Sequence, residues 1–324
     1  MPMRSPNLVK MVGGNFLGVI LLVEIIAVMS GHSFGANGLS MNYYLTTCPF
    51  AEQIVRNTVF RALLADPTLA AGLVRMHFHD CFIQGCDGSI LIDSTNDNTA
   101  EKDSPANLSV RGYEVIDAAK EQLEKMCPGV VSCADIVAMA ARDSAGGPPY
   151  GIQNGRKDGR RSKAEDTFNL PPPTLNASQL ITKFRQHGFS VEEMVALSGA
   201  HTLGVATCRA FKNRLSDVDP TLDEDFAKTL SKTCSSGDNA KQPFDETMNR
   251  FDNLYFNTLQ RKAGVLTSDQ TLFADSRTAG TVNRFAFNQA MFFASFQGAM
   301  IKMGALDVKQ GSRGEVRKNC HKFN

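Results

Sequence analysis

The densest group of reactive side chains lies in the run RMHFHDCF at positions 75–82. If this run is helical, Arg75 and His79 are four positions apart and share a face, with Phe78 next to them. His77 is two positions from His79 and therefore points elsewhere. A cation, an imidazole and an aromatic ring on one face could activate a small polar substrate, although a single histidine in an apolar helix is more often a satisfied core residue.

A second histidine, His201, lies among small residues in the run LSGAHTLG at positions 197–204. Such a histidine could cap a helix or pack in the core. The close backbone approach that Gly199, Ala200 and Gly204 permit would also suit a flat ligand.

Oxygen-bearing side chains follow the first run directly, in DCFIQGCDGS at positions 80–89. Asp80, Asp87 and Ser89 offer hard oxygen ligands, and loop carbonyls can add more. This composition suits calcium better than a transition metal. Turn and helix-cap chemistry explains the same residues equally well when composition alone is considered.

Helices must position these residues, because apolar side chains recur mostly at helical spacing. One helix is predicted to start after Pro49 and to stop at Asp66-Pro67. A second runs from Arg111-Gly112 to Pro128-Gly129, and a third, the alanine-rich stretch 134–141, should be buried. Further helices are predicted around 178–187, 191–197, 202–213, 252–262 and 285–303. Long alternating stretches are absent from the sequence, so the chain is predicted to be mostly α with a minor sheet, as one large domain or two lobes.

The N-terminus differs from the rest of the chain. Arg4 and Lys10 precede an apolar stretch at 16–23, and small and polar residues follow up to position 38. This order is typical of a secretory signal peptide, which we assign to residues 1–38, leaving 39–324 as the folded domain. The alternative is a membrane anchor, but Gly13, Gly14, Asn15 and Glu24 on either side of the apolar stretch weaken a bilayer-spanning run.

Charge bears on the expected partners, and cysteine content agrees with a secreted protein. The chain has 34 Lys and Arg against 33 Asp and Glu, and removing residues 1–38 leaves 32 of each, so charge gives no reason to expect nucleic acid or an anionic membrane as a partner. All eight cysteines follow the expected cleavage point, and an even number in a secreted chain favours four disulfides. Spacing leaves the connectivity of the cysteines open. The sequence contains no Cys-x-x-Cys motif, which argues against a zinc-binding or redox role for them.

Six sequence strings occur in one order over residues 39–324: RMHFHDCFIQGCDGSILID, AEKDSPANLSVRGYEVID, CPGVVSCADIVAMAARD, NLPPP, VALSGAHTLG and TSDQTLF. Together they resemble the plant secretory (class III) haem peroxidases. The resemblance implies a mostly α fold in which two helical lobes sandwich a haem, with little β structure. It also implies haem b and two calcium ions as cofactors.

On the distal side of the haem, the resemblance assigns His79 as the acid–base residue and Arg75 as the cation. Phe78 would lie beside the porphyrin, Asn107 would orient the histidine, and Glu101 would belong to the same hydrogen-bond network. On the proximal side, His201 would bind the iron.

The resemblance assigns Asp269 to the other nitrogen of the proximal imidazole, where a carboxylate makes the ligand more electron-donating. Pro171 would lie near the entrance for the reducing substrate. Of two glycosylation sequons, Asn176 is expected to be the acceptor, because Asn107 should be buried.

The remaining implied sites are two calcium sites and four disulfides. The distal calcium site would use Asp80, Asp87 and Ser89 side chains, Ile83 and Gly85 carbonyls, and Glu101 through water. The proximal site would use Thr202, Asp245, Thr247 and Asp252, in a segment shorter than is usual for the family. The implied disulfides are Cys48–Cys127, Cys81–Cys86, Cys133–Cys320 and Cys208–Cys234.

The implied activity is oxidation of small phenolic donors by hydrogen peroxide. His79 would move a proton between the two peroxide oxygens while Arg75 stabilises the developing charge. An oxo-iron(IV) porphyrin radical would then be reduced by two donor molecules in one-electron steps. The expected protein is a monomer secreted to the cell wall or apoplast, with no membrane association after signal cleavage.

Two other hypotheses explain part of the sequence. A secreted wall-binding or structural protein on a peroxidase scaffold, with impaired catalysis, has no physical need to keep Arg75, His79, His201 and Asp269 together. A non-haem, calcium-binding disulfide scaffold accounts for the acidic loop and the cysteines, but not for the two histidine runs.

Overall fold

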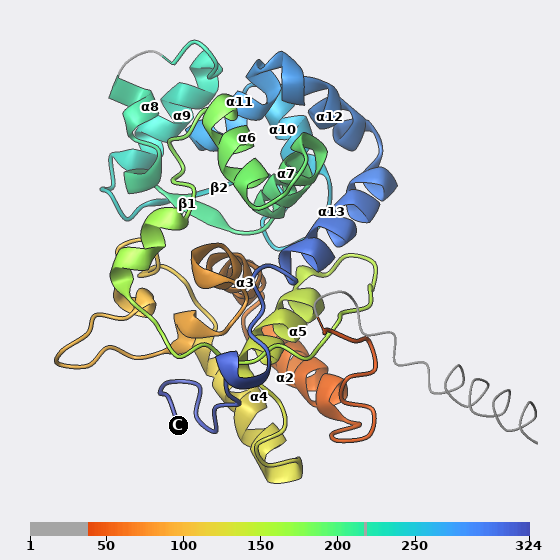
Figure 1. Ribbon diagram of the computed structural model, residues 1–324. Coiled ribbons are helices and arrows are strands. Elements are labelled where there is room, and N and C mark those ends of the chain that lie inside the picture. Colours follow the sequence, from red (N-terminus) through yellow and green to blue (C-terminus); the bar gives the residue numbers. More distant parts are fainter. Residues whose placement is uncertain (1–37, 217–218) are drawn as a thin grey trace, which may run out of the picture.

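The computed structural model describes residues 38–216 and 219–324, so the expected signal peptide, except Gly38, lies outside the described residues. The described chain is mostly helical with one two-stranded sheet, as predicted (Figure 1). Its α-helices are α2 (Ala51–Ala65), α3 (Leu69–Gln84), α4 (Tyr113–Met126), α5 (Cys133–Ala145), α6 (Ala177–Gln186), α7 (Val191–Ser198), α8 (Asn213–Ser216), α9 (Glu224–Cys234), α10 (Leu254–Gln260), α11 (Thr267–Ala274), α12 (Ser276–Phe287) and α13 (Gln289–Met303).

The helices form two groups, which are the two expected lobes. Figure 1 shows α2, α4 and α5 in one group and α6, α7 and α9–α13 in the other, with α3 between them. One apolar core joins α2, α4 and α5 to one face of α3, and a second joins the other face of α3 to α6, α7, α10, α12 and α13. Helix α3, which carries the first histidine run, therefore packs into both lobes.

Local signals explain where the helices of the first lobe begin and end. Helix α2 lies between Pro49 and Pro67, as predicted, and it ends before Asp66 because a proline disfavours helical backbone in the residue before it. Gly112, with a φ of 100°, precedes α4, and the side chain of Ser132 caps α5 by accepting from the Asp135 backbone N–H. Most of α5 is buried, as its alanine-rich sequence predicted.

One predicted helix is wrong, and a second is divided between two helices. The stretch 202–213 contains the end of a 3₁₀ turn, η4 (Gly199–Thr202), then strand β1 (Val205–Thr207), a second turn, η5 (Cys208–Ala210), and the first residue of α8. Gly204 adopts a φ of 89°, which is incompatible with a continuous helix, and β1 pairs antiparallel with β2 (Lys241–Pro243). The stretch 285–303 is divided at Asn288, whose side chain caps α13. Helices α9 and α11, and all but the last three residues of α12, were not predicted.

Four disulfides link the described chain in the pairing that the resemblance implied. They join Cys48–Cys127, Cys81–Cys86, Cys133–Cys320 and Cys208–Cys234. The Cys133–Cys320 bond spans 187 residues and returns the C-terminal segment to the first lobe. Within the described residues, no helix combines the length and the apolar character that a bilayer crossing requires.

Candidate active site

Helix α3 presents Arg75 and His79 on one face, as their spacing predicted. The Arg75 Nε lies 3.1 Å from the His79 Nε2. The two other guanidinium nitrogens donate to the Ala106 carbonyl and the Ser109 hydroxyl, both at 2.9 Å. The cation is therefore fixed beside the imidazole by contacts outside its own helix. The Phe78 ring lies next to the His79 ring, with centroids 5.6 Å apart.

Asn107 fixes the tautomer of His79. Its Nδ2 donates to the Glu101 carbonyl at 2.8 Å, so its Oδ1, 2.5 Å from the His79 Nδ1, must be an acceptor. The Nδ1 therefore carries the proton, and Nε2 is the basic nitrogen that faces Arg75. Burial, followed by the charge of Arg75, lowers the pKa of His79 to about 3, so the imidazole is neutral over the ordinary pH range. Asn107 is buried beside Glu101, as expected.

His77 points away from this face and contributes no metal site. Its Nδ1 lies 3.6 Å from the Cys81 Sγ, and Cys86 is nearby, which is a ligand combination that metals can use. The two cysteines are joined in a disulfide, so their sulfurs are not thiolate ligands. His77 is thus a buried core residue.

His201 lies in the 3₁₀ turn that follows α7. Its Nδ1 is 2.7 Å from the Asp269 Oδ1, whereas its Nε2 has no hydrogen-bond partner among the described residues. The ring stacks on Phe244 with centroids 4.3 Å apart and planes 2° apart. The His201 side chain keeps 38% of its surface exposed, so the free nitrogen is open to a ligand.

Asp269, on α11, accepts more hydrogen bonds than the sequence indicated. Its Oδ1 also accepts from the Tyr255 hydroxyl at 3.0 Å, and its Oδ2 accepts from the Leu266 backbone N–H at 3.0 Å. Burial, followed by the charge of Asp269, raises the pKa of Tyr255 well above its usual value. Tyr255 had no signal in the sequence beyond that of an apolar core aromatic.

The two histidine sites fit a haem. One side offers an exposed imidazole with one uncommitted nitrogen, and the other offers a neutral base next to a fixed cation. A Cβ on Gly204 would lie 2.8 Å from the Ala71 Cβ, so the backbone that follows His201 lies against α3. A single free imidazole held by a carboxylate is a known arrangement for a haem-iron ligand.

The acidic residues after α3 form a buried cluster. Asp80 accepts from the Gly88 backbone N–H at 3.0 Å, and the Ser89 hydroxyl donates to the Glu101 Oε2 at 3.1 Å. Burial first, and then its neighbour Asp87, raises the pKa of Asp80 to about 8. Burial also raises the pKa of Asp87 to about 6, and that of Glu101 well above its usual value.

This cluster fits a divalent cation. The Glu101 Oε1 is buried with no hydrogen-bond partner among the described residues, as expected of an oxygen that faces a hydrated ion. A cation would also offset the repulsion between the carboxylates. Ile83 and Gly85 lie at the end of α3 beside the cluster, where the Ile83 carbonyl accepts from Asn169 at 3.1 Å and Gly85 needs its φ of 95° to turn the chain.

The residues expected at the proximal calcium site also come together. The Thr202 hydroxyl lies 2.6 Å from the Asp245 Oδ2 and 3.3 Å from the Asp252 Oδ1. Thr247 donates to the same two carboxylates, at 3.1 and 3.2 Å through its hydroxyl. The short segment therefore still brings the four oxygen-bearing side chains together next to His201.

Pro171 is half-buried in the loop that follows the 3₁₀ turn η3 (Ala164–Asn169). Two residues later, the Pro173 carbonyl accepts from the Ser268 backbone N–H at 2.9 Å. This bond attaches the proline-rich loop to the residue before Asp269.

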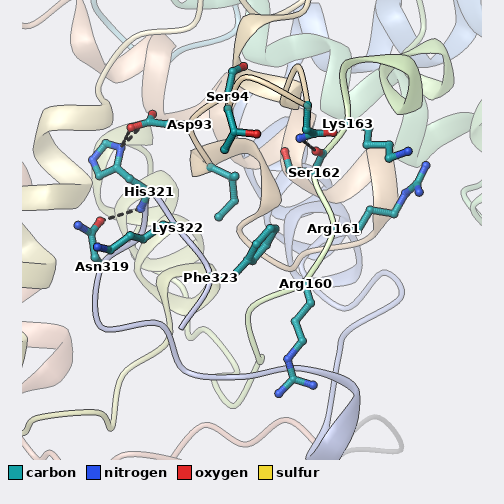
Figure 2. Close-up of a pocket in the computed structure, with 13 residues that line it drawn as sticks. Asp93, Ser94, Arg160, Arg161, Ser162, Lys163, Asn319, His321, Lys322 and Phe323 are labelled. Atoms are coloured by element: carbon teal, nitrogen blue, oxygen red, sulfur yellow. Dashed lines mark hydrogen bonds and ion pairs between the residues drawn. The ribbon is translucent and has the colours of Figure 1, made fainter.

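A cavity of about 930 Å³ lies elsewhere, between the segments 92–98, 160–163 and 319–323 (Figure 2). Figure 2 shows Phe323 near its centre and Asp93 next to His321. Its arginines are already paired, Arg160 with Glu315 at 3.3 Å and Arg161 with Asp166 at 2.9 Å. None of the catalytic candidates lines this cavity.

Comparison with known proteins identifies the family. A family profile described as peroxidase matches residues 55–288. The chain belongs to the plant class III peroxidases. It is 66% identical to Peroxidase 47 of Arabidopsis thaliana, over 97% of each chain. It is 46% identical to Peroxidase 66 of Arabidopsis thaliana, over 94% of this chain and 98% of the relative. It is 48% identical to Peroxidase 5 of Vitis vinifera, over 88% of this chain and 92% of the relative.

The protein is therefore a peroxidase, an enzyme that oxidises a donor at the expense of hydrogen peroxide, and haem is the cofactor of its family. The predicted family, fold class and enzyme activity are confirmed. The comparisons give no support to a binding protein with impaired catalysis.

Proposed function

We propose that this peroxidase binds haem b through the His201 Nε2 and cleaves peroxide with His79 and Arg75. The observation that carries the proposal is the fixed tautomer of His79, whose basic Nε2 lies 3.1 Å from a permanent cation. A histidine that merely filled the core would need neither that orientation nor that neighbour. The pair formed by His201 and Asp269, with one free imidazole nitrogen, supports the position of the iron.

The protein side chains supply the proton transfers. When bound, haem supplies the iron that holds the peroxide and stores its oxidising equivalents. The His79 Nε2 takes the proton of one peroxide oxygen and returns it to the other, which leaves as water. Its pKa of about 3 keeps it unprotonated and able to act as the base. Arg75 remains charged throughout and stabilises the negative charge that develops as the O–O bond breaks.

We also propose two calcium sites, with the ligands expected above. The orphaned Glu101 oxygen and the raised pKa values of Asp80 and Asp87 support the distal site. The convergence of Thr202, Asp245, Thr247 and Asp252 supports the proximal site, and Thr202 follows the proposed iron ligand directly. Calcium there would stabilise the backbone that carries His201.

The reducing substrates that we propose are small phenols, which would approach near Pro171. We propose a monomeric protein that is secreted to the cell wall or apoplast after removal of residues 1–38, with residues 39–324 as the mature domain. The four disulfides support an oxidising compartment. Asn176 is exposed at the N-cap of α6, which supports glycosylation there.

Optical spectroscopy of the purified protein tests the assignment. The haem absorption band should change after one equivalent of peroxide and return in two steps when a phenol is added. His79→Ala should keep the band but react with peroxide about 10²- to 10⁴-fold more slowly, which is the usual contribution of a positioned acid–base group. An unchanged rate in that variant would remove His79 from the reaction.

His201→Ala should lose the five-coordinate ferric spectrum. The same spectrum in this variant as in the wild type would mean that the iron ligand lies elsewhere in the chain.

A further inference from the structure

The proximal carboxylate receives two side-chain donors on a single oxygen. The Asp269 Oδ1 lies 2.7 Å from the His201 Nδ1 and 3.0 Å from the Tyr255 hydroxyl. We propose that Tyr255 is a positioning residue that limits how strongly Asp269 polarises His201 and so sets the reduction potential of the iron. This inference rests on the proposed function, because it requires His201 to be the iron ligand.

The direction of the Tyr255 hydrogen bond follows from chemistry. An ionised carboxylate only accepts hydrogen bonds, so the phenol must donate. Among the described residues, the Tyr255 hydroxyl has no other hydrogen-bond partner. Its side chain is 1% exposed, so water does not compete for the proton. The hydroxyl therefore donates to Asp269 whenever the carboxylate is ionised.

The two donors compete because they share the electron density of one oxygen atom. Each hydrogen bond to a carboxylate withdraws negative charge from it and makes it a weaker acceptor for the next donor. The Leu266 backbone N–H at the other oxygen withdraws charge in the same way, but it is fixed by the start of α11. Tyr255 is thus the donor whose removal changes the Asp269–His201 bond without altering the backbone.

The packing around the imidazole keeps this geometry rigid. Tyr255 is on α10, and its ring meets the His201 ring edge-on at a centroid distance of 6.1 Å. Phe244 covers one face of the same imidazole in a parallel stack. Among the described residues, His201 and Tyr255 are the two side chains that hydrogen-bond to Asp269.

Removing the phenolic hydroxyl should strengthen the remaining His201–Asp269 bond. The imidazole then gains anionic character and becomes a stronger electron donor to the metal. A stronger donor stabilises ferric over ferrous iron. Tyr255→Phe should therefore lower the ferric/ferrous midpoint potential and raise the iron–imidazole stretching frequency of the ferrous protein.

The experiment measures both quantities, by redox titration and by resonance Raman spectroscopy, on the haem-loaded full chain. Asp269→Asn serves as the opposite reference, because loss of the carboxylate should raise the potential and lower the frequency. Tyr44→Phe is the matched control. Its hydroxyl also donates to a buried aspartate, the Asp135 Oδ2 at 2.6 Å, but in the first lobe. The control should lose stability without moving either signal.

A midpoint potential and a stretching frequency in Tyr255→Phe equal to those of Tyr44→Phe would overturn the inference. Tyr255→Phe keeps the ring that packs against His201, so a change in either signal reports the lost hydroxyl and not a change in packing. Absence of an iron–imidazole band from the wild type, or its persistence in His201→Ala, would overturn the proposed function, and the role of Tyr255 with it.

Discussion

Asn107→Ala should slow the reaction with peroxide while leaving the haem in place. The wild-type amide makes two bonds, one to the His79 Nδ1 at 2.5 Å and one to the Glu101 carbonyl at 2.8 Å. In the variant the His79 Nδ1 proton has no acceptor, and only the Arg75 Nε–H, which donates to the His79 Nε2, still favours the original tautomer. A larger fraction of the imidazole then carries the proton on Nε2, the nitrogen that must be unprotonated to act as a base.

The size of the effect follows from the cost of an unsatisfied buried donor, about 1–3 kcal/mol. We take this energy as the free-energy difference by which Asn107 favours the correct tautomer of His79. Because about 1.4 kcal/mol corresponds to a factor of ten, the second-order rate constant for the reaction with peroxide should fall about 5- to 150-fold. The Glu101 carbonyl also loses its partner. The free energy of unfolding should therefore decrease by about 2–6 kcal/mol in total.

Stopped-flow mixing with excess peroxide measures the rate constant, and chemical denaturation measures stability. Asn154→Ala is the matched control, because Asn154 and Asn107 are both 1% exposed and Asn154 is not part of the distal network. If both variants lost similar stability and reacted with peroxide within about twofold of the wild type, the tautomer argument would be refuted.

Asn107→Asp provides a test with the opposite sign. A carboxylate beside the Nδ1 proton favours the imidazolium, so the pKa of His79 should rise from about 3. The pH below which peroxide reacts slowly should then move upward. An unchanged pH profile in a folded Asn107→Asp variant would contradict the proposed environment of His79.

Three further predictions concern calcium, a disulfide and the distal cation. In calcium-free protein, Asp80 and Asp87 have pKa values of about 8 and about 6, above the unfolded value of about 4. The folded state therefore binds more protons than the unfolded state, and its stability decreases as these protons are lost. The melting temperature in EGTA should fall as the pH rises from about 5 to about 8. Excess calcium should remove that pH dependence, and its persistence would argue against a cation between these carboxylates. Replacing Cys133 and Cys320 together by alanine should reduce the free energy of unfolding by about 2–5 kcal/mol, measured by denaturation; no loss would show that the bond does not constrain the chain. In Arg75→Lys, the lysine side chain cannot reproduce the three guanidinium contacts of Arg75. Peroxide cleavage, measured by stopped-flow mixing, should therefore be slower by about tenfold or more. A wild-type rate in this variant would show that the positive charge alone suffices.

The sequence predicted those parts of the fold and of the site that depend on local residue patterns or on motifs shared with the family. Pro49 and Pro67 bracket α2 as expected, and the spacing of Arg75 and His79 placed them on one face. The stretch 202–213 was mispredicted because its structure depends on pairing with residues 241–243, which helical periodicity does not report.

Tyr255 was missed for a related reason. Nothing near it in the sequence indicates that its hydroxyl meets a carboxylate on α11, and an aromatic residue at helical spacing predicts only burial. Contacts between side chains from different helices appear only once the helices are packed.

The Cys133–Cys320 bond has a consequence for the order in which this protein is made. Arg317, three residues before the last cysteine, is buried and donates to the Gly88 carbonyl in the acidic loop. The first lobe therefore needs residues that are synthesised long after its own helices. At about 5–20 residues per second, the 187 residues between the two cysteines take roughly 10 to 40 s to synthesise. During that interval Cys133 cannot pair with Cys320, and an early bond to another cysteine would have to be reversed before the native bond forms.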